Sequence, residues 1–343
     1  MSGATQAPTY DAAEEFLQSR TPAQRVQTTL HRYPWLSPAI VLVLSVIVFG
    51  LLNEKFATPN NLSLITQQVA VVGALAVGQT LIILTAGIDL SCGAIMVFSS
   101  MVMAKTAFDQ GIPGWLAILL GLVVGGLAGA ANGLLVTKVR LPPFIVTLGT
   151  LNIFLAFTLL YATGRTIRDA ELATGLAWLG ETFSIGQVRI TTGVLVMIAL
   201  YVVFGFVLRY TAWGRHVYAV GDDADSARLA GIQVQRVLLS VYVVAGVIYG
   251  ITAWILIGRV NAASPNSGID ANLDSITAVV IGGTSLFGGR GTVIGSLIGA
   301  LIVGVFRNGL LLAGVNPNYQ TLAIGILVIL AVSVDQWIRR ARA

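Results

Sequence analysis

Long apolar runs separated by short polar stretches fill almost the whole sequence after residue 35. A helix needs about 20 residues to cross a hydrocarbon core of about 30 Å, and most of these runs reach or approach that length. Inside a bilayer the backbone must satisfy its own hydrogen bonds, which favours helices. The pattern therefore predicts an all-α, polytopic membrane bundle of about ten transmembrane segments. They are expected at residues 36–52, 62–85, 93–107, 114–136, 142–162, 190–208, 237–258, 275–287, 292–313 and 319–337.

The eighth segment, 275–287, is short for a span and rich in glycine. We expect it to be a half-helix, or to be extended backwards through Asn272, Leu273 and Asp274. A full span and a re-entrant segment both remain open from the sequence. Broken helices of this kind are typical of transporters, where they surround binding regions.

The distribution of Lys and Arg predicts the orientation, because these residues gather in cytoplasmic loops. With the amino terminus inside, thirteen of the 20 basic residues fall on the cytoplasmic side, six outside, and Arg307 within a segment. Ten spans return the chain to its starting side, so both termini are predicted to be cytoplasmic. The outer set is Lys55, Lys105, Arg165, Arg168, Arg189 and Arg259.

Three parts follow from this topology. The polar residues 1–35 lack the apolar stretch and the cleavage site of a signal peptide, so they form a cytoplasmic tail, and 36–52 acts as an uncleaved anchor. Residues 36–338 form the membrane domain, with a long cytoplasmic loop at 209–236. Residues 339–343 form a short basic cytoplasmic tail.

Composition excludes a soluble protein. Hydrophobic residues make up 56% of the chain and charged residues 10%, against about 25% charged in soluble domains. The mean hydropathy is +0.84. Although the net charge is +5, the basic residues stand singly between apolar runs, so a lipid bilayer is the expected partner and nucleic acid is not.

The chain also lacks the residues that catalysis or ATP hydrolysis would need. Its lysines are Lys55, Lys105 and Lys138, and none follows a glycine as a phosphate-binding loop requires. One cysteine, Cys92, and two distant histidines offer neither a disulfide nor a metal site. We expect no enzyme activity and no bound cofactor or metal, so transport would draw energy from a partner or from an ion gradient.

An ion-coupled secondary transporter is expected to have several buried carboxylates or histidines, and the sequence offers only Asp89 as a candidate. It lies in a break, Thr85–Gly93, between two apolar runs. Three roles are open for it: capping of the next helix, gating or coupling, and ion binding. Neutral hydrogen-bonding groups are expected to line a pathway: Gln67, Gln68, Gln79, Asn132 and Asn152, with Ser91 beside Asp89.

Glycine is concentrated at three places. Two ladders at spacing four occur in the fourth and ninth segments, and they predict close helix packing, or else exposure to the pathway. The run Gly282–Gly291 contains five glycines, and its Gly282, Gly283, Thr284 and Ser285 are candidate gating residues. The break around Asp89 and this run each lie between two apolar helices, which suggests a weak internal repeat. The ladders are Gly121, Gly125, Gly129 and Gly133, and Gly291, Gly295 and Gly299.

Polar stretches outside the apolar runs could receive soluble partners. In the inner loop, Asp225–Ala230 is predicted to be a short helix that stops at Gly231. This helix would either dock a partner or belong to a solvated loop. The same alternatives hold for the outer loop, Thr163–Arg189, which carries Arg165, Arg168, Asp169, Glu171 and Glu181. Arg307 and Asn308 interrupt the ninth segment, and snorkelling of Arg307 to the outer interface is favoured.

Five stretches of this chain resemble the permeases of ribose-type, carbohydrate-importing ABC transporters, in order over roughly residues 20–340. Details near both ends and at Asn272, where ribose-type members usually carry glutamate, fit the fructose-type branch of that family. Those details are Ser19–Pro22, Gly221–Asp223, Ala271–Ser275 and Asp335–Arg339. The five stretches are Gly87–Ser91, Leu141–Gly149, Gly214–Gly221, Ala227–Gly231 and Ile276–Gly291.

This resemblance implies a bacterial inner-membrane importer of a monosaccharide: fructose, or alternatively ribose, mannose or xylose. Two permease copies would form the pathway, a separate cytoplasmic ATPase would use ATP and Mg²⁺, and a periplasmic sugar-binding protein would deliver the substrate. The stretch Gly214–Ile232 would couple to the ATPase. Its candidate residues are Gly214, Arg215, Tyr218, Gly221, Asp222, Ala227, Arg228, Ala230 and Gly231.

Overall fold

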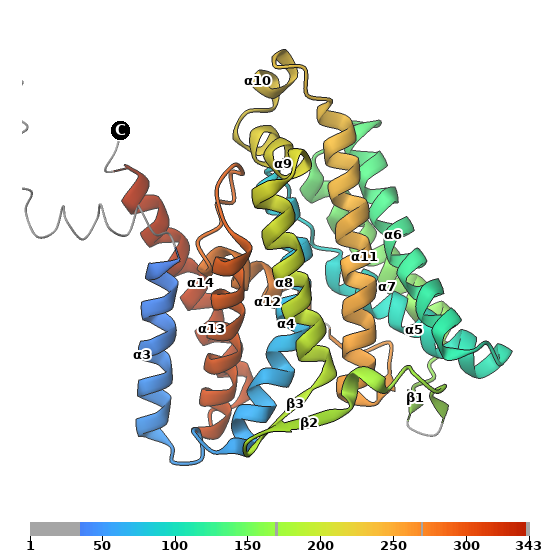
Figure 1. The fold of residues 1–343 in the computed structure, drawn as a ribbon, viewed down its shortest axis with the longest axis vertical. Helices are drawn as coiled ribbons and strands as arrows, with labels where there is room; N and C mark the ends of the chain where they lie inside the picture. The colour runs from blue at the N-terminus through green and yellow to red at the C-terminus, as the bar shows by residue number, and fades with distance from the viewer. Residues whose placement is uncertain (1–34, 169–170, 269, 341–343) are drawn as a thin grey trace, which may run out of the picture.

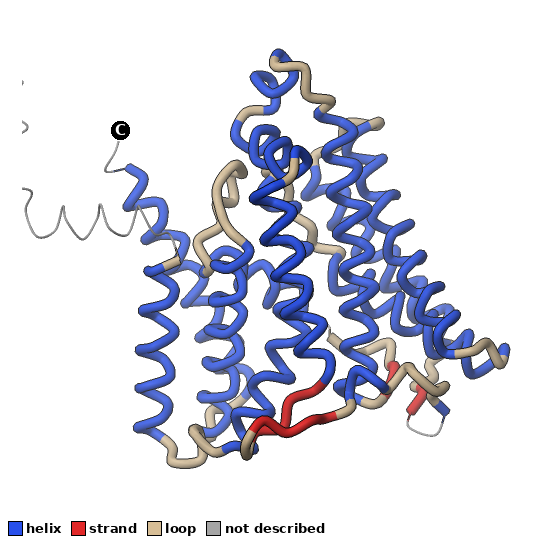
Figure 2. The backbone as a smooth tube through the Cα atoms, in the orientation of Figure 1, coloured by secondary structure: helices blue, strands red, loops and turns tan. Residues whose placement is uncertain are grey.

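The computed structural model describes residues 35–168, 171–268 and 270–340. The predicted tail 1–35, with Ser19–Pro22, lies outside these ranges except for Trp35. Asp169 of the outer loop and the last three residues of the tail 339–343 also lie outside them. Within the described ranges the chain is a helical bundle, with two short helices at one end and small strands at the other (Figures 1 and 2).

Each of the ten predicted segments coincides with a helix, although the boundaries shift by a few residues. Seven of them are long and apolar enough to cross a membrane: α4, α5, α6, α7, α8, α11 and α13. This confirms a polytopic helical membrane protein. The ten helices are α3 (Leu36–Leu52), α4 (Pro59–Leu84), α5 (Cys92–Gln110), α6 (Gly114–Thr137), α7 (Pro143–Ala162), α8 (Thr192–Tyr210), α11 (Val234–Val260), α12 (Ala271–Ile281), α13 (Val293–Leu312) and α14 (Pro317–Arg340).

The prediction that the eighth segment extends as a helix to residue 287 is wrong. Helix α12 begins at Ala271 and ends at Ile281, so it includes Asn272–Asp274 but not the glycine-rich run. Gly283, Gly288 and Gly289 have φ values of 85°, 83° and 68°, which side chains rarely adopt and which end the helix in a loop. With 11 residues at 1.5 Å each, α12 covers only about half of a hydrocarbon core.

Two small sheets, at the end opposite the short helices α9 (Ala212–Asp222) and α10 (Ala224–Leu229), correct the purely helical expectation. β2 (Thr182–Ile185) and β3 (Val188–Thr191) form a hairpin in the outer loop, with Gly186 at a positive φ in the turn. β1 (Ile167–Arg168) pairs with β4 (Ala262–Ala263), which ties that loop to the end of α11. The 3-10 helix η2 (Trp178–Gly180) lies between strands β1 and β2 in the sequence.

The centre of the bundle is formed by α4, α5 and α11, which are mostly buried, whereas only 39%, 28% and 33% of the apolar windows of α6, α7 and α8 are buried. Large apolar side chains are buried in α4, and apolar side chains on the outer helices remain exposed, as a bilayer requires. Among the buried ones are Leu75, Leu81, Ile82, Ile83 and Leu84.

The glycine ladders bring helix backbones together. A Cβ on Gly125 would overlap the carbonyl oxygen of Gly246, and one on Gly129 would overlap that of Tyr242, so α6 and α11 are in backbone contact. In the second ladder, a Cβ on Gly299 would overlap the Ala278 carbonyl, which joins α13 to α12. The packing interpretation therefore accounts for these positions.

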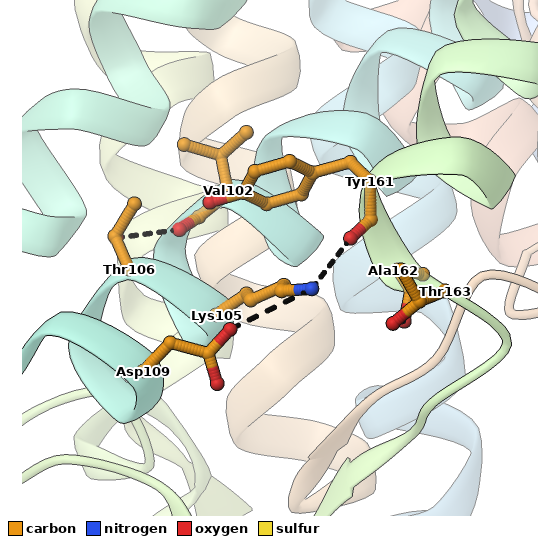
Figure 3. A network of polar contacts seen from close by, with 7 residues as sticks. All are labelled: Val102, Lys105, Thr106, Asp109, Tyr161, Ala162 and Thr163. Carbon is orange, nitrogen blue, oxygen red and sulfur yellow. Dashed lines mark hydrogen bonds and ion pairs between the residues drawn. The ribbon is translucent and has the colours of Figure 1, made fainter.

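A small polar network fastens the carboxyl-terminal end of α5 to α7 (Figure 3). The Lys105 ammonium donates to the carbonyl oxygen of Tyr161 at 2.8 Å and lies 3.5 Å from Asp109. Thr163 ends α7 in a left-handed conformation. A cation near a helix carboxyl terminus also interacts favourably with its dipole.

Candidate translocation and coupling sites

The break between α4 and α5 places a buried carboxylate inside the bundle. Asp89 is 1% exposed, and its Oδ1 accepts hydrogen bonds from the Ser91 amide at 2.7 Å and the Ser91 hydroxyl at 2.6 Å. These bonds order the turn that precedes α5. The Thr147 hydroxyl of α7 donates to the Ile88 carbonyl at 2.9 Å, so a third helix holds the same turn.

Asn132 of α6 extends this site. Its Nδ2 donates to the Ser91 hydroxyl at 2.8 Å, while its Oδ1 is buried without a hydrogen-bond partner among the described residues. From α11, the Tyr249 hydroxyl donates to Oε1 of Gln79 at 3.3 Å. The predicted residues Asp89, Ser91 and Asn132 thus meet directly, and Gln79 lies in the same buried region through Tyr249.

This polar cluster is only partly satisfied within the described chain. Nε2 of Gln79, Oδ1 of Asn132 and the Tyr242 hydroxyl are buried with no hydrogen-bond partner there. A buried polar group without a partner costs about 1–3 kcal/mol, so these three groups make this arrangement of the cluster less stable than a fully hydrogen-bonded one would be.

The two predicted breaks meet in space. Asn272 of α12 donates to the Leu90 carbonyl at 3.1 Å, and the Cys92 sulfur lies 3.6 Å from the Ser275 hydroxyl. At the other end of α12, the Gly289 amide donates to the Leu84 carbonyl at 2.9 Å. The glycine-rich loop thus follows α12 and bonds to the end of α4, while the Asp89 turn follows α4 and bonds to the beginning of α12.

The inner loop 209–236 contains two short helices, α9 (Ala212–Asp222) and α10 (Ala224–Leu229), at the end of the bundle opposite the strands (Figure 1). The predicted helix Asp225–Ala230 corresponds to α10, and Gly231 follows it with a φ of 85°. The coupling candidates divide between them: Gly214, Arg215, Tyr218, Gly221 and Asp222 lie on α9, Ala227 and Arg228 on α10, and Ala230 and Gly231 after it.

Helix α9 is seated on the glycine-rich loop. The Tyr218 hydroxyl donates to the Gly291 carbonyl at 2.8 Å. A Cβ on Gly221 would overlap the Leu84 carbonyl and lie 2.7 Å from the Gly289 amide nitrogen. Asp222 also packs against Gly289. Helix α9, the glycine-rich loop and the end of α4 are therefore in close backbone contact, with no room for an added side-chain atom.

Helix α10 projects from this contact. Asp223 caps it by accepting from the amides of Asp225 at 2.9 Å and Ser226 at 2.8 Å, and the Ser226 bond is the main reason that the pKa of Asp223 is lowered. Arg228 pairs with Asp225 at 2.9 Å on the surface. Leu229, which sequence reasoning missed, is 91% exposed. Its side chain is therefore free to contact a partner protein at the surface.

A cavity of about 500 Å³ lies among α4, α11, α12 and α13. Asp274 of α12 and Arg307 of α13 form an ion pair of 2.8 Å in its wall, and Gln68, Arg259 and Asp270 are further polar lining residues. The Arg307 side chain is 37% exposed, so its snorkelling to the interface stays a prediction, and the ion pair with Asp274 is an interaction that the sequence did not predict. No spacing in the sequence signals this pair, because 33 residues separate its members.

The other pathway candidates are dispersed. Asn152 lies apart from the Asp89 cluster, on the exposed surface of α7, and its Nδ2 bonds to the Leu148 carbonyl at 3.0 Å. Gln67 donates to the Ser63 hydroxyl at 3.2 Å. Gly282 ends α12, and Gly283, Thr284 and Ser285 lie in the loop beneath α9.

The outer loop carries an exposed ion pair beside the β1–β4 sheet. Arg165 donates to Glu171 at 2.7 Å, and this hydrogen bond is the main cause of the lowered pKa of the Glu171 carboxyl. Ser63 of α4 donates to the Arg189 carbonyl, which fastens β3 to the bundle. The loop thus offers an ordered polar surface at this end.

The described residues contain no group of three or more His, Cys, Asp or Glu side chains placed to hold a metal ion. Their two buried carboxylates within the bundle, Asp89 and Asp274, engage Ser91 and Arg307. The positions of both carboxylates are therefore explained by contacts within the chain.

Comparison with known proteins identifies the class. Residues 61–332 match the family described as "Branched-chain amino acid transport system / permease component". The fructose import permease protein of Rhizobium meliloti is 50% identical over 97% of this chain and 94% of its own length. The ribose import permease protein of Bacillus subtilis is 40% identical over 88% and 92%, and the D-allose transport system permease protein of Escherichia coli K12 is 36% identical over 88% and 91%. This chain thus belongs to the permease-component family of bacterial inner-membrane transport systems, and it is a transport protein and not an enzyme.

Proposed function

We propose that two copies of this chain form the membrane pathway of an ATP-driven importer of a monosaccharide, with fructose as the preferred substrate. The observation that carries this proposal is the 50% identity to a fructose import permease along 97% of the chain. The other relatives named above are also permeases for sugars, ribose and allose. The family description mentions amino acids, so the substrate class rests on these relatives.

The importer would have three kinds of subunit. A separate cytoplasmic ATPase would hydrolyse ATP with Mg²⁺, and this chain would bind neither. A periplasmic sugar-binding protein would dock on the ordered outer surface formed by the β2–β3 hairpin and the Arg165–Glu171 pair. With the amino terminus in the cytoplasm, the chain would pass from one face of the membrane to the other ten times, and the eighth passage would be made by the short helix α12 together with the glycine-rich loop that follows it. Both termini and the 209–236 loop would then lie in the cytoplasm.

The contacts of α9 and α10 support a route for coupling. The ATPase would grip α10 at Leu229, and its closure would push α9. Since Tyr218 and Gly221 of α9 contact the glycine-rich loop directly, the push would move that loop and, with it, α12. At the far end of α12, Asn272 bonds to the turn around Asp89, whose partly satisfied cluster would rearrange as the gate.

The test is uptake of labelled fructose into vesicles that contain this chain with its ATPase and binding protein, with ribose, allose and leucine as competitors. We expect uptake only when ATP and all three components are present, and the strongest competition from fructose itself. An ATPase variant that binds but does not hydrolyse ATP is the control.

Uptake by this chain alone that an ionophore abolishes would contradict the proposal and favour an ion-coupled transporter. Competition by leucine but not by the sugars would contradict the substrate class. Competition by ribose or allose above fructose would retain the importer and replace the preferred sugar.

A further inference from the structure

We propose that the cavity among α4, α11, α12 and α13 is a transit site in the permease itself for a neutral, polyhydroxylated ligand of monosaccharide size. Its volume of about 500 Å³ lies in the range of about 300–1,000 Å³ that is usual for small-molecule sites. It is lined by the end of α11 and the loop before α12, so it lies toward the end of the bundle that carries the strands and away from α9.

The Asp274–Arg307 pair supplies directional hydrogen bonds for a ligand. The pair uses one carboxylate oxygen of Asp274 and one guanidinium nitrogen of Arg307. A carboxylate has a second acceptor oxygen, and a guanidinium has five N–H groups in a plane. Adjacent sugar hydroxyls, each both donor and acceptor, can bind this acceptor and these donors together.

Gln68 provides independent evidence for a polar occupant. Its Oε1 is buried and has no hydrogen-bond partner among the described residues, although the side chain lines the cavity. Leaving such an acceptor empty costs about 1–3 kcal/mol. A rotation of the Gln68 side chain would turn this oxygen toward the cavity, where a hydroxyl donor of a ligand would recover that cost.

The charges of the lining residues favour a neutral ligand. Asp270 and Asp274 balance Arg259 and Arg307, so the wall has no formal net charge. An anion or a cation would meet one attractive and one repulsive pair, and would also lose its hydration on entry. The choice of a sugar among neutral ligands rests on the proposed function.

The position of Asp274 links this cavity to the coupling segment. Asp274 lies in the first turns of α12, and the other end of the same helix leads into the glycine-rich loop that contacts Tyr218. A shift of α12 would therefore change the geometry of the Asp274–Arg307 pair. The site would hold its ligand in one state of the transporter and release it in the other.

Protection of an engineered cysteine tests the site without any transport step. The full chain carries Ser267→Cys in the cavity wall and is reconstituted in lipid nanodiscs, and maleimide labelling is timed with and without D-fructose. The native Cys92 is buried and gives the background rate. At a fructose concentration ten times the dissociation constant, which we expect to be on the order of millimolar, labelling slows about tenfold by mass action.

Matched variants make the result specific. Ser184→Cys, on the exposed β2 strand, is the control that fructose leaves unchanged. Gln68→Leu removes the unpartnered oxygen while preserving the ion pair, and we expect roughly tenfold weaker protection. Asp274→Asn combined with Arg307→Gln removes both charged groups together and abolishes protection, and size-exclusion chromatography verifies that each variant is folded.

Three outcomes would overturn the proposal: no protection at any sugar concentration, equal protection of Ser267→Cys and Ser184→Cys, or protection that persists in both cavity variants. Protection by leucine and by no sugar would also overturn it. Protection by ribose or allose in place of fructose would support the site and correct only the preferred sugar. ATP-driven fructose uptake by the complete importer without any protection would refute this site while leaving the proposed function intact.

Discussion

Gly221 leaves no room for a side chain where α9 contacts the glycine-rich loop, because its Cα faces the Leu84 carbonyl and the Gly289 amide. We predict that Gly221→Ala separates α9 from the glycine-rich loop. Such overpacking typically costs about 1–3 kcal/mol. Fructose uptake should fall strongly, while ATP hydrolysis by the assembled complex becomes independent of substrate delivery.

The control for this substitution is Gly205→Ala on α8. A Cβ there would meet Val293 at 3.5 Å, an ordinary contact, so uptake should be unchanged. Normal, substrate-dependent ATP hydrolysis in Gly221→Ala would show that the contact does not transmit motion.

Asp223 gives α10 a predictable pH dependence. Its folded pKa is lowered below the ordinary value of about 3.9, so its cap stabilises α10 above that pH and is lost as the pH falls through the folded pKa. Hydrogen exchange of residues 223–231, corrected for the intrinsic rate, should therefore accelerate on acidification. Asp223→Asn, an equally good cap without a charge, should stay protected throughout, and Asp223→Ala should be unprotected throughout. A pH response in Asp223→Asn would assign the effect to another group.

At the scale of helices, the α6–α11 contact depends on glycines whose Cα atoms meet the opposite backbone. We predict that Gly125→Ala, which would push against the Gly246 carbonyl, lowers the melting temperature of the detergent-solubilised chain because overpacking costs about 1–3 kcal/mol. Gly149→Ala on α7 is the matched control, since a Cβ there has open space within 4 Å. An equal effect of both substitutions would show that helix propensity and not packing is responsible.

Element boundaries were predictable where the chemistry is local. Helix α10 lies between a capping Asp223 and a stopping Gly231, and both signals are visible in the sequence. The end of α12 was misplaced because Ile276–Ile281 and Leu286–Phe287 are equally apolar, and only the backbone conformation of Gly283, Gly288 and Gly289 separates helix from loop. The hairpin β2–β3 was missed because its strands are four residues long.

At the scale of the whole molecule, the exposed Leu229 makes assembly with the ATPase testable. We predict that Leu229→Asp weakens binding of the ATPase by about 2 kcal/mol, roughly 30-fold, because a charge would enter an apolar groove. Co-purification of the ATPase with this chain in nanodiscs measures it. Arg215→Gln, at an exposed position of α9, tests whether a positive charge on the neighbouring helix contributes. Undiminished binding in Leu229→Asp would remove α10 from the docking surface.

The candidate sites show how far residue patterns reach. Asp89 and Asn132 were selected from different segments, and both bond to Ser91, because polar groups inside apolar segments have few partners there other than one another. Asn152 was selected by the same reasoning and lies on an exposed face of α7, since the sequence does not reveal which way a uniformly apolar helix is rotated.

The sequence by itself determined the helical membrane bundle, the order of its apolar helices, the breaks and the family, because hydrophobic length, glycine and the matching motifs are local properties of the chain. Only the tertiary structure decided which breaks touch, how α9 is seated on the glycine-rich loop, and that Asp274 pairs with Arg307 beside a cavity. Those contacts join residues far apart in the chain, and their geometry depends on the rotation and depth of each helix. Packing between helices sets both of these.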